Sequence, residues 1–178
     1  MSFLDLARRR YSTRAYTNQA VAKDKLDIIL EAGQVAPTGH NNQPQRIIVV
    51  QSKEGLAKVQ KAAEIYNAQL ALLVCTDKDE VWTRSFDDKK ITDIDASIVT
   101  DHMMLAATDI GLDSLWICRF KADVIKAEFA LPDNIEVVNI LVIGHRDETK
   151  WQAKLATRHE QERKVLAKTV FYEDFHQK

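Results

Sequence analysis

Four arginines lie close together near the start of the chain, in the stretch RRRYSTRAY that covers residues 8–16. An arginine side chain is permanently charged, and its planar set of N–H donors binds phosphate or carboxylate oxygens two at a time. The cluster therefore predicts a site for one small anion. A simpler interpretation also stands, in which these arginines form the solvated end of a helix and interact favourably with its dipole by about 0.3–1 kcal/mol.

A second polar segment covers residues 36–44, with the sequence APTGHNNQP, between an expected helix and an expected strand. It combines small, amide and turn-forming residues, and loops at this place in α/β proteins often bind ligands. It can equally be a polar turn without a ligand. The chain contains no GxGxxG or GxxxxGK motif, so a bound phosphate has to be held by side chains.

The overall composition is that of one folded domain. The chain has 178 residues, of which 46% are apolar and 29% are charged, and this excludes the composition of a disordered protein. The 25 basic and 26 acidic residues nearly cancel, which argues against a nucleic-acid binder. No apolar run is long enough for a membrane span, and the N-terminus lacks a signal-peptide pattern. We therefore expect a cytoplasmic protein.

The cysteines and histidines do not form a metal-binding or disulfide pattern. Cys75 and Cys118 each lie in an apolar, strand-like run and are expected to be buried free thiols. The five histidines are scattered, so no metal site is expected. His102 lies in an apolar helical stretch, where a hydrogen-bonded core or interface residue is the simplest interpretation.

Hydrophobic periodicity predicts an alternation of helices and buried strands. Helices are expected at residues 2–10, 23–36, 53–64, 92–110 and 121–130, and strands at 46–50, 70–75, 112–120 and 137–143. The helix at 92–110 is apolar on several sides, so the core or a second subunit has to cover it. Residues 170–172 are apolar within a polar C-terminal region, and they predict either a final strand or an arm onto a partner.

Five segments, taken in order, resemble the nitroreductase family of FMN-dependent oxidoreductases. They are RRRYSTRAY, APTGHNNQPQRIIVV, DASIVTDHMMLAATDIGLDSLWICRF, LPDNIEVVNILVIG and ERKVLAKTVFYEDF. The resemblance extends along nearly the whole chain and implies one domain over residues 1–178. It implies an α+β fold with a mixed sheet flanked by helices, and an intertwined homodimer with one FMN in each of two interface sites. Residues from about 150 to 178 would form the arm onto the partner.

The resemblance also implies four groups of FMN-binding residues. The phosphate, the ribityl chain and the pyrimidine edge would be held by Arg10, Tyr11, Ser12 and Arg14. The loop that reaches across from the other subunit would contain Pro37, Thr38, Gly39, Asn41 and Gln43. The strand end beside the flavin ring, where a backbone N–H faces N5, would consist of Trp116, Ile117, Cys118 and Arg119, and the arginine that closes on the phosphate would be Arg163.

The chain departs from the family pattern at three positions. Where the family often has glycine, or an acidic residue followed by glycine, this chain has Cys118 and Arg119, which changes the ring site and the substrate that fits it. The lysine often found two residues before the last arginine is Gln161, so the phosphate site has one charge fewer. Trp116 also has a simpler interpretation as a core aromatic residue.

The implied reaction is hydride transfer from NADH or NADPH, through flavin N5, to a nitroaromatic, a quinone or a similar small-molecule acceptor. The flavin carries this chemistry, so no catalytic side chain is expected, and no Ser-His-Asp or Cys-His pattern is evident. Two alternatives remain. One is a same-fold enzyme with another reaction, such as flavin reduction, ene reduction or dehalogenation. The other is a flavin-binding module without turnover.

Overall fold

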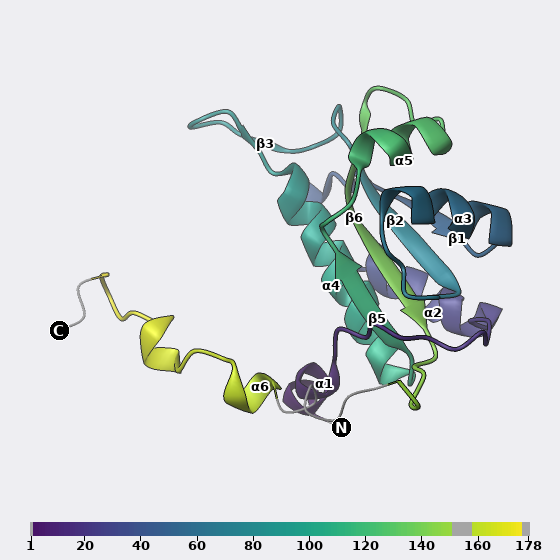
Figure 1. Cartoon of the computed structure of the whole chain (residues 1–178). Helices are drawn as coiled ribbons and strands as arrows, with labels where there is room; N and C mark the ends of the chain where they lie inside the picture. Colours follow the sequence, from purple (N-terminus) through teal and green to yellow (C-terminus); the bar gives the residue numbers. More distant parts are fainter. Residues whose placement is uncertain (1, 151–157, 176–178) are drawn as a thin grey trace.

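A four-stranded antiparallel sheet forms the centre of the molecule, and helices cover both of its faces (Figure 1). The computed structural model describes residues 2–150 and 158–175. The strand order is β1-β2-β6-β5, with bounds Gln45–Val50 for β1, Leu70–Asp77 for β2, Ile135–Gly144 for β6 and Asp113–Ile117 for β5. The expected α+β class is confirmed. Within the described residues, the parallel component of the expected mixed sheet is an isolated bridge between Ser12 and Ser114.

Strand β2 shows why the sheet is covered on both faces, because all eight of its residues are buried. Successive side chains of a strand point to opposite faces. Leu72 and Val74 accordingly pack with helices α2 (Lys23–Gln34) and α4 (Thr92–Asp109). Leu73 and Cys75 pack with α3 (Lys53–Ala62) and α5 (Ala122–Glu128) on the other face. A continuous apolar run is therefore what this central strand requires.

Helix α4 packs closely against α2, and this contact depends on a glycine. A Cβ atom added at Gly33 would lie 2.9 Å from Met103 Cγ, so a larger residue there would push the two helices apart. Met103 and Val99 are fully buried between the helices and the sheet. The expectation that the core covers much of this apolar helix is therefore confirmed.

Helix α1 (Phe3–Arg9) delivers the arginine cluster to one end of the sheet. It begins with a capping box, in which Ser2 Oγ accepts from the Asp5 N–H and Asp5 accepts from the Ser2 N–H. The helix ends at Arg9, and the chain then runs along the outer edge of β5, where the Thr13 N–H donates to the Ser114 oxygen at 3.0 Å (Figure 1). Arg10 thus lies at the turn between a helix and the edge of the sheet.

Two expectations about local structure, both near the end of β5, are wrong, and one of the two alternatives for residues 170–172 is excluded. Strand β5 ends at Ile117, three residues before the expected end, and Cys118 is exposed instead of buried. Residues 170–172 do not form a strand. The sequence reasoning also missed a short hairpin formed by β3 (Thr83–Arg84) and β4 (Lys89–Lys90), in which charged residues surround the exposed Phe86.

The C-terminal segment leads away from the sheet and its helices (Figure 1). It contains helix α6 (Arg158–Gln161) and a 3-10 turn at Leu166–Lys168. Several of its apolar side chains are exposed, among them Leu166, Tyr172 and Phe175 at 76–79%. None of the helices in the described ranges is long and apolar enough to cross a membrane.

Candidate functional site

A small polar cavity forms between the turn after α1 and the residues of α6 at the start of the C-terminal segment. It has a volume of about 250 Å³ and is lined by Arg10, Tyr11, Ser12, His159, Glu162 and Arg163. The turn after α1 supplies the first three residues, and α6 with the residues after it supplies the others. The structure therefore brings Arg10 and Arg163, which the family resemblance assigns to one phosphate site, to the same cavity.

The electrostatics of this cavity favour an anion. Burial lowers the pKa of Arg10, the positive charge of Arg163 lowers it further, and the carboxylate of Asp101 acts in the opposite direction. Burial is the larger cause, and the contribution of Arg163 means that the two guanidinium charges repel each other in this cavity. A bound anion would relieve this repulsion, and two guanidinium groups have the geometry to hold phosphate oxygens.

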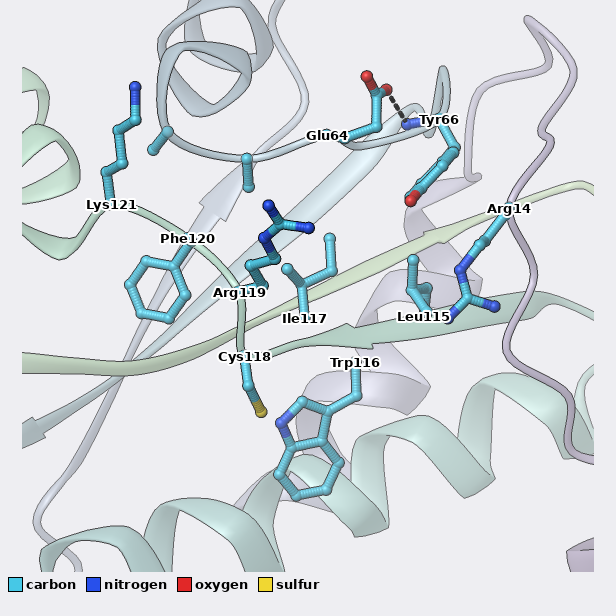
Figure 2. Close-up of a pocket in the computed structure, with 12 residues that line it drawn as sticks. Arg14, Glu64, Tyr66, Leu115, Trp116, Ile117, Cys118, Arg119, Phe120 and Lys121 are labelled. Atoms are coloured by element: carbon cyan, nitrogen blue, oxygen red, sulfur yellow. Dashed lines mark hydrogen bonds between the residues drawn. The ribbon is translucent and has the colours of Figure 1, made fainter.

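A second, larger cavity lies along the end of strand β5. Its volume is about 520 Å³, and its lining includes Trp116, Ile117, Cys118, Arg119 and, across the cavity, Arg14 (Figure 2). The Trp116 indole and the Cys118 thiol point to one side of the strand end, whereas Arg119 points to the other. Arg119 is exposed. The third predicted group is thus gathered in one place, together with one member of the first group.

Ser12 contacts one arginine from each cavity. Arg10 Nη1 lies 3.5 Å from Ser12 Oγ, and Arg14 Nη1 donates to the Ser12 carbonyl oxygen at 3.3 Å. The two arginines therefore leave the same short stretch in different directions, one into each cavity. An elongated ligand with an anionic end can extend from the small cavity into the large one past Ser12.

The large cavity presents backbone groups and one unsatisfied side-chain donor. Ser114 directs its carbonyl oxygen to the outer edge of β5, where Thr13 binds it. Because the two edges of a strand alternate, the N–H and C=O of Trp116 face this same edge. The indole Nε1 of Trp116 is buried without a hydrogen-bond partner among the described atoms. A ligand with heteroatoms along one edge can satisfy such groups.

The loop at residues 37–43 lies at the N-terminal end of α4. The Gly39 N–H donates to Oδ1 of Asp95 at 2.9 Å, and this carboxylate is 1% exposed. Thr38 Oγ1 accepts from the Gln43 N–H at 3.1 Å. Sequence reasoning missed Asp95, because a single aspartate in the first turn of a helix carries no motif.

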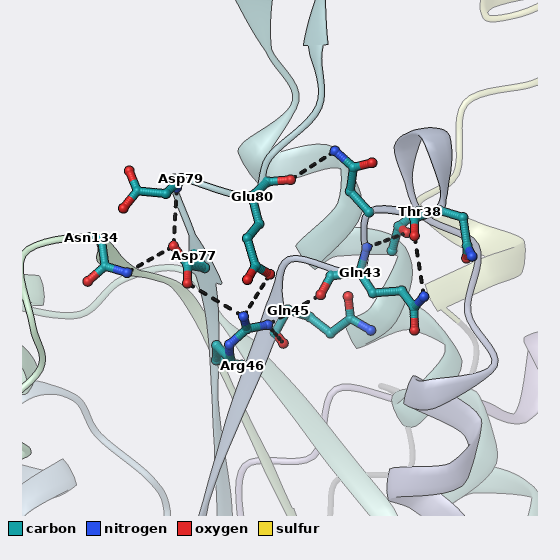
Figure 3. Close-up of polar contacts among 10 residues, drawn as sticks. Thr38, Gln43, Gln45, Arg46, Asp77, Asp79, Glu80 and Asn134 are labelled. Carbon is teal, nitrogen blue, oxygen red and sulfur yellow. Dashed lines mark hydrogen bonds and ion pairs between the residues drawn. The ribbon is translucent and has the colours of Figure 1, made fainter.

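Arg46 fixes the other side of this loop (Figure 3). Its guanidinium donates to the Gln43 oxygen at 3.3 Å and pairs with Glu80 at 2.7 Å. The amide of Asn42 donates to the Glu80 carbonyl oxygen at 2.9 Å. The loop is therefore fixed in one conformation by contacts on both sides.

The loop does not reach the small cavity within one chain. Arg9, next to that cavity, donates to the Thr108 oxygen at the C-terminal end of α4, whereas Gly39 contacts Asp95 at the opposite end. At 1.5 Å per residue, Asp95 and Thr108 are about 20 Å apart along the helix. The members of the second group, Pro37, Thr38, Gly39, Asn41 and Gln43, line neither of the two cavities.

An α+β domain with an arginine-lined cavity beside a cavity along a strand edge belongs to the class of proteins that bind an elongated ligand with an anionic end. Comparison with known proteins identifies the family. The family model described as Nitroreductase family matches residues 7–70 and 61–145. The chain therefore belongs to the nitroreductase family.

Three relatives illustrate the similarity. A nitroreductase family protein of Clostridium difficile 630 has a crystal structure that is 53% identical, covers 98% of this chain and 100% of its own, and gives a TM-score of 0.93. An FMN-dependent nitroreductase of Clostridium difficile R20291 is 27% identical, with 97% and 100% coverage and a TM-score of 0.78. An FMN reductase (NAD(P)H) of Bacillus subtilis strain 168 is 31% identical over 75% of this chain and 61% of its own length.

Proposed function

We propose that this chain is an NAD(P)H-dependent FMN oxidoreductase, which passes reducing equivalents to a nitroaromatic, a quinone or a similar acceptor as a homodimer. The observation that carries the proposal is the pair of cavities whose arginines both contact Ser12, one with Arg10 and Arg163 and one along the edge of β5. Two of the relatives carry FMN in their names, and two carry nitroreductase. When bound, FMN would supply hydride transfer through its N5 atom.

The small cavity fits the phosphate group of FMN. Arg10 and Arg163 provide charged donors from two ends of the chain, and Ser12 provides a hydroxyl. Burial lowers the pKa of Arg10 and the charge of Arg163 lowers it further, so a phosphate between the two guanidinium groups would relieve their repulsion. These residues bind the phosphate and so fix the position of the rest of the cofactor.

The large cavity fits the isoalloxazine ring. The free edge of β5 offers the backbone N–H and C=O of Trp116, and the indole of Trp116 offers a further unsatisfied donor. The guanidinium of Arg14 lines the same cavity and can reach the pyrimidine edge of the ring, where positive charge favours the reduced, anionic flavin. Arg119 and Cys118 then contribute to the space in which reductant and acceptor bind.

The position of the loop at residues 37–43 supports a homodimer. In a two-fold dimer that pairs α4 with its copy in opposite directions, the N-terminal end of one helix lies beside the C-terminal end of the other. Such pairing brings the loop of one chain toward the small cavity of its partner. The surface of α4 supports this arrangement, because Ile94 is 47% exposed and Ile98 and Leu105 are only partly buried.

The C-terminal segment supplies a second argument for the dimer. Leu166, Tyr172 and Phe175 are exposed in a single chain. Removing apolar surface from water is favourable by about 25 cal/mol per Å², so contact with a second copy would stabilise these side chains. Covering them against a second copy is the expected role of an arm that starts near residue 150. The cytoplasmic location and the identity of the acceptor stay predictions.

The first experiment tests the cofactor and the enzyme class. Heating or acidifying the purified protein should release FMN, and NADH or NADPH should be consumed steadily when menadione or nitrofurazone is present. A colourless protein that takes up no added FMN contradicts the proposal. Bound FMN without turnover would instead indicate a flavin-binding module, and a product assay across acceptor classes separates the reactions that this fold supports.

A complementation experiment tests the shared site. Arg10→Ala damages the phosphate cavity of a chain, and Asn41→Ala damages its loop. If each site takes arginines from one chain and the loop from the other, mixed dimers contain one intact site, so random exchange restores about a quarter of all sites. No recovery in the mixture would show that each chain builds its site alone.

A further inference from the structure

The small arginine cavity contains a histidine that no sequence motif indicated. His159 lies on α6 and is half-buried, and its Nε2 atom is 3.2 Å from the carbonyl oxygen of Arg10. The imidazole lines the same cavity as Arg10, Ser12 and Arg163. It therefore borders the space that the proposed function gives to the phosphate of FMN.

The contact with Arg10 determines which ring nitrogen can change its protonation. A carbonyl oxygen only accepts hydrogen bonds, so Nε2 of His159 has to carry the hydrogen and donate. Nδ1 is then the atom that gains or loses a proton. A second N–H donor and a positive charge appear together when Nδ1 is protonated, and histidine ordinarily makes this change between about pH 5 and pH 8.

The charges around His159 make its protonation depend on the ligand. Arg10 and Arg163 oppose a third positive charge, whereas Glu162 lines the cavity with a negative one and Asp101 acts on Arg10 from α4. Tyr11 is the other titratable group of the lining. A phosphate dianion between the two arginines shifts the balance toward the imidazolium.

We propose that His159 is a third cationic ligand of the phosphate group in this cavity, and that its binding depends on pH. It supplies the positive charge that the family resemblance would place at residue 161, where this chain has Gln161. This inference rests on the proposed FMN function and adds to it a binding residue and a pH response. Cofactor affinity then falls as the imidazole loses its proton.

The test compares the wild-type protein with His159→Gln in fluorescence titrations with FMN. Glutamine can still donate to the Arg10 oxygen but cannot become charged. Near pH 6, the wild-type protein should bind FMN about ten- to a hundredfold more tightly than the variant. Near pH 8.5, the two FMN affinities should differ by less than about threefold. Protonation of the phosphate itself, which occurs near pH 6, cancels in this ratio because both proteins bind the same ligand.

Two controls isolate the role of His159. Riboflavin lacks the phosphate, so its affinity ratio should stay near one at every pH. His145→Gln removes another partly buried histidine from outside the cavity and should leave the FMN profile unchanged. If His159→Gln does not fold, NMR of the wild-type ring replaces it, and FMN but not riboflavin should move the midpoint of the His159 titration to higher pH.

The possible outcomes separate this inference from the function on which it rests. FMN binding with a wild-type to variant ratio that is constant across the pH range overturns the role of His159 and leaves the oxidoreductase proposal standing. An NMR midpoint that FMN does not move has the same meaning. A protein that fails to bind FMN at any pH overturns both.

Discussion

Replacing Arg10 by alanine tests the phosphate cavity most directly. A hydrogen bond to a charged group contributes about 1.5–3 kcal/mol, so the variant should bind FMN roughly ten- to a hundredfold more weakly. The effect on folding should be small. Arg10 makes a long side-chain contact of 3.5 Å to Ser12, and its pKa is lowered by burial and by Arg163, so its charge is not stabilised by the fold.

The assay is a fluorescence titration of the apoprotein with FMN, accompanied by thermal unfolding without the cofactor. We expect the unfolding free energy of Arg10→Ala to change by less than about 0.5 kcal/mol. Arg8→Ala is the matched control, because it removes the same charge from an exposed position two residues away. Riboflavin should bind the wild-type protein and both variants with similar affinity, since it lacks the phosphate.

The double variant of Arg10 and Arg163 extends the argument. If both guanidinium groups bind the same phosphate, the two losses should not simply add, and a double-mutant cycle should give a coupling of about 0.5 kcal/mol or more. Unchanged FMN affinity in Arg10→Ala, or an equal loss in Arg8→Ala, would refute the phosphate site. In either case the two guanidinium groups of the cavity would not be the ligands of the FMN phosphate.

Two further predictions concern the packing and the thiols. Gly39→Ala places a Cβ atom onto Ile91 Cδ1, the end of a side chain that can move, and 3.3 Å from Trp82 Cβ. Thermal unfolding should therefore show a loss of about 1 kcal/mol, and an equal or larger loss in Gly39→Ser would agree with overpacking as the cause. Cys75 is buried and its pKa is raised to about 12, so a thiol reagent should label only the exposed Cys118 in the native protein at neutral pH, and both cysteines after unfolding.

Local signals in the sequence predicted the elements that position the site. The helices expected at residues 2–10 and 92–110 and the run at residues 70–75 each depend on neighbouring residues alone, and the structure contains all three. The second helix is followed by Gly111, whose φ of 76° lies in the left-handed region that glycine adopts at helix ends. Such features follow from short-range rules, so one sequence suffices.

Other features depend on partners that the sequence does not reveal. The run around Trp116 to Cys118 is apolar enough for a longer strand, but the last pair of β5 with β6 joins Ile117 to Ile140. Cys118 lies beyond the ladder and is therefore exposed. Residues 170–172 pair with no strand among the described residues, so their β-forming composition has no effect there.

The cavity of Arg10 and Arg163 could be predicted only through the family resemblance. No property of either residue indicates a partner about 150 positions away, because such contacts follow from the complete fold. His159 and Asp95 were missed for the same reason. Each is an ordinary polar residue on a helix, and its role appears only when the facing element is known.

The conformation of the loop at residues 37–43 is itself evidence of a functional role. His40, Asn41 and Gln43 adopt φ values of 54°, 56° and 52°, in the left-handed region that is costly for residues other than glycine. Such a cost of order 1–3 kcal/mol for each residue persists only when surrounding contacts enforce it. Asp95 and Arg46 provide those contacts from two directions. Because a simple connection from α2 to β1 would not need this cost, the conformation supports the proposal that the loop presents its amides and hydroxyl to a second copy of the chain.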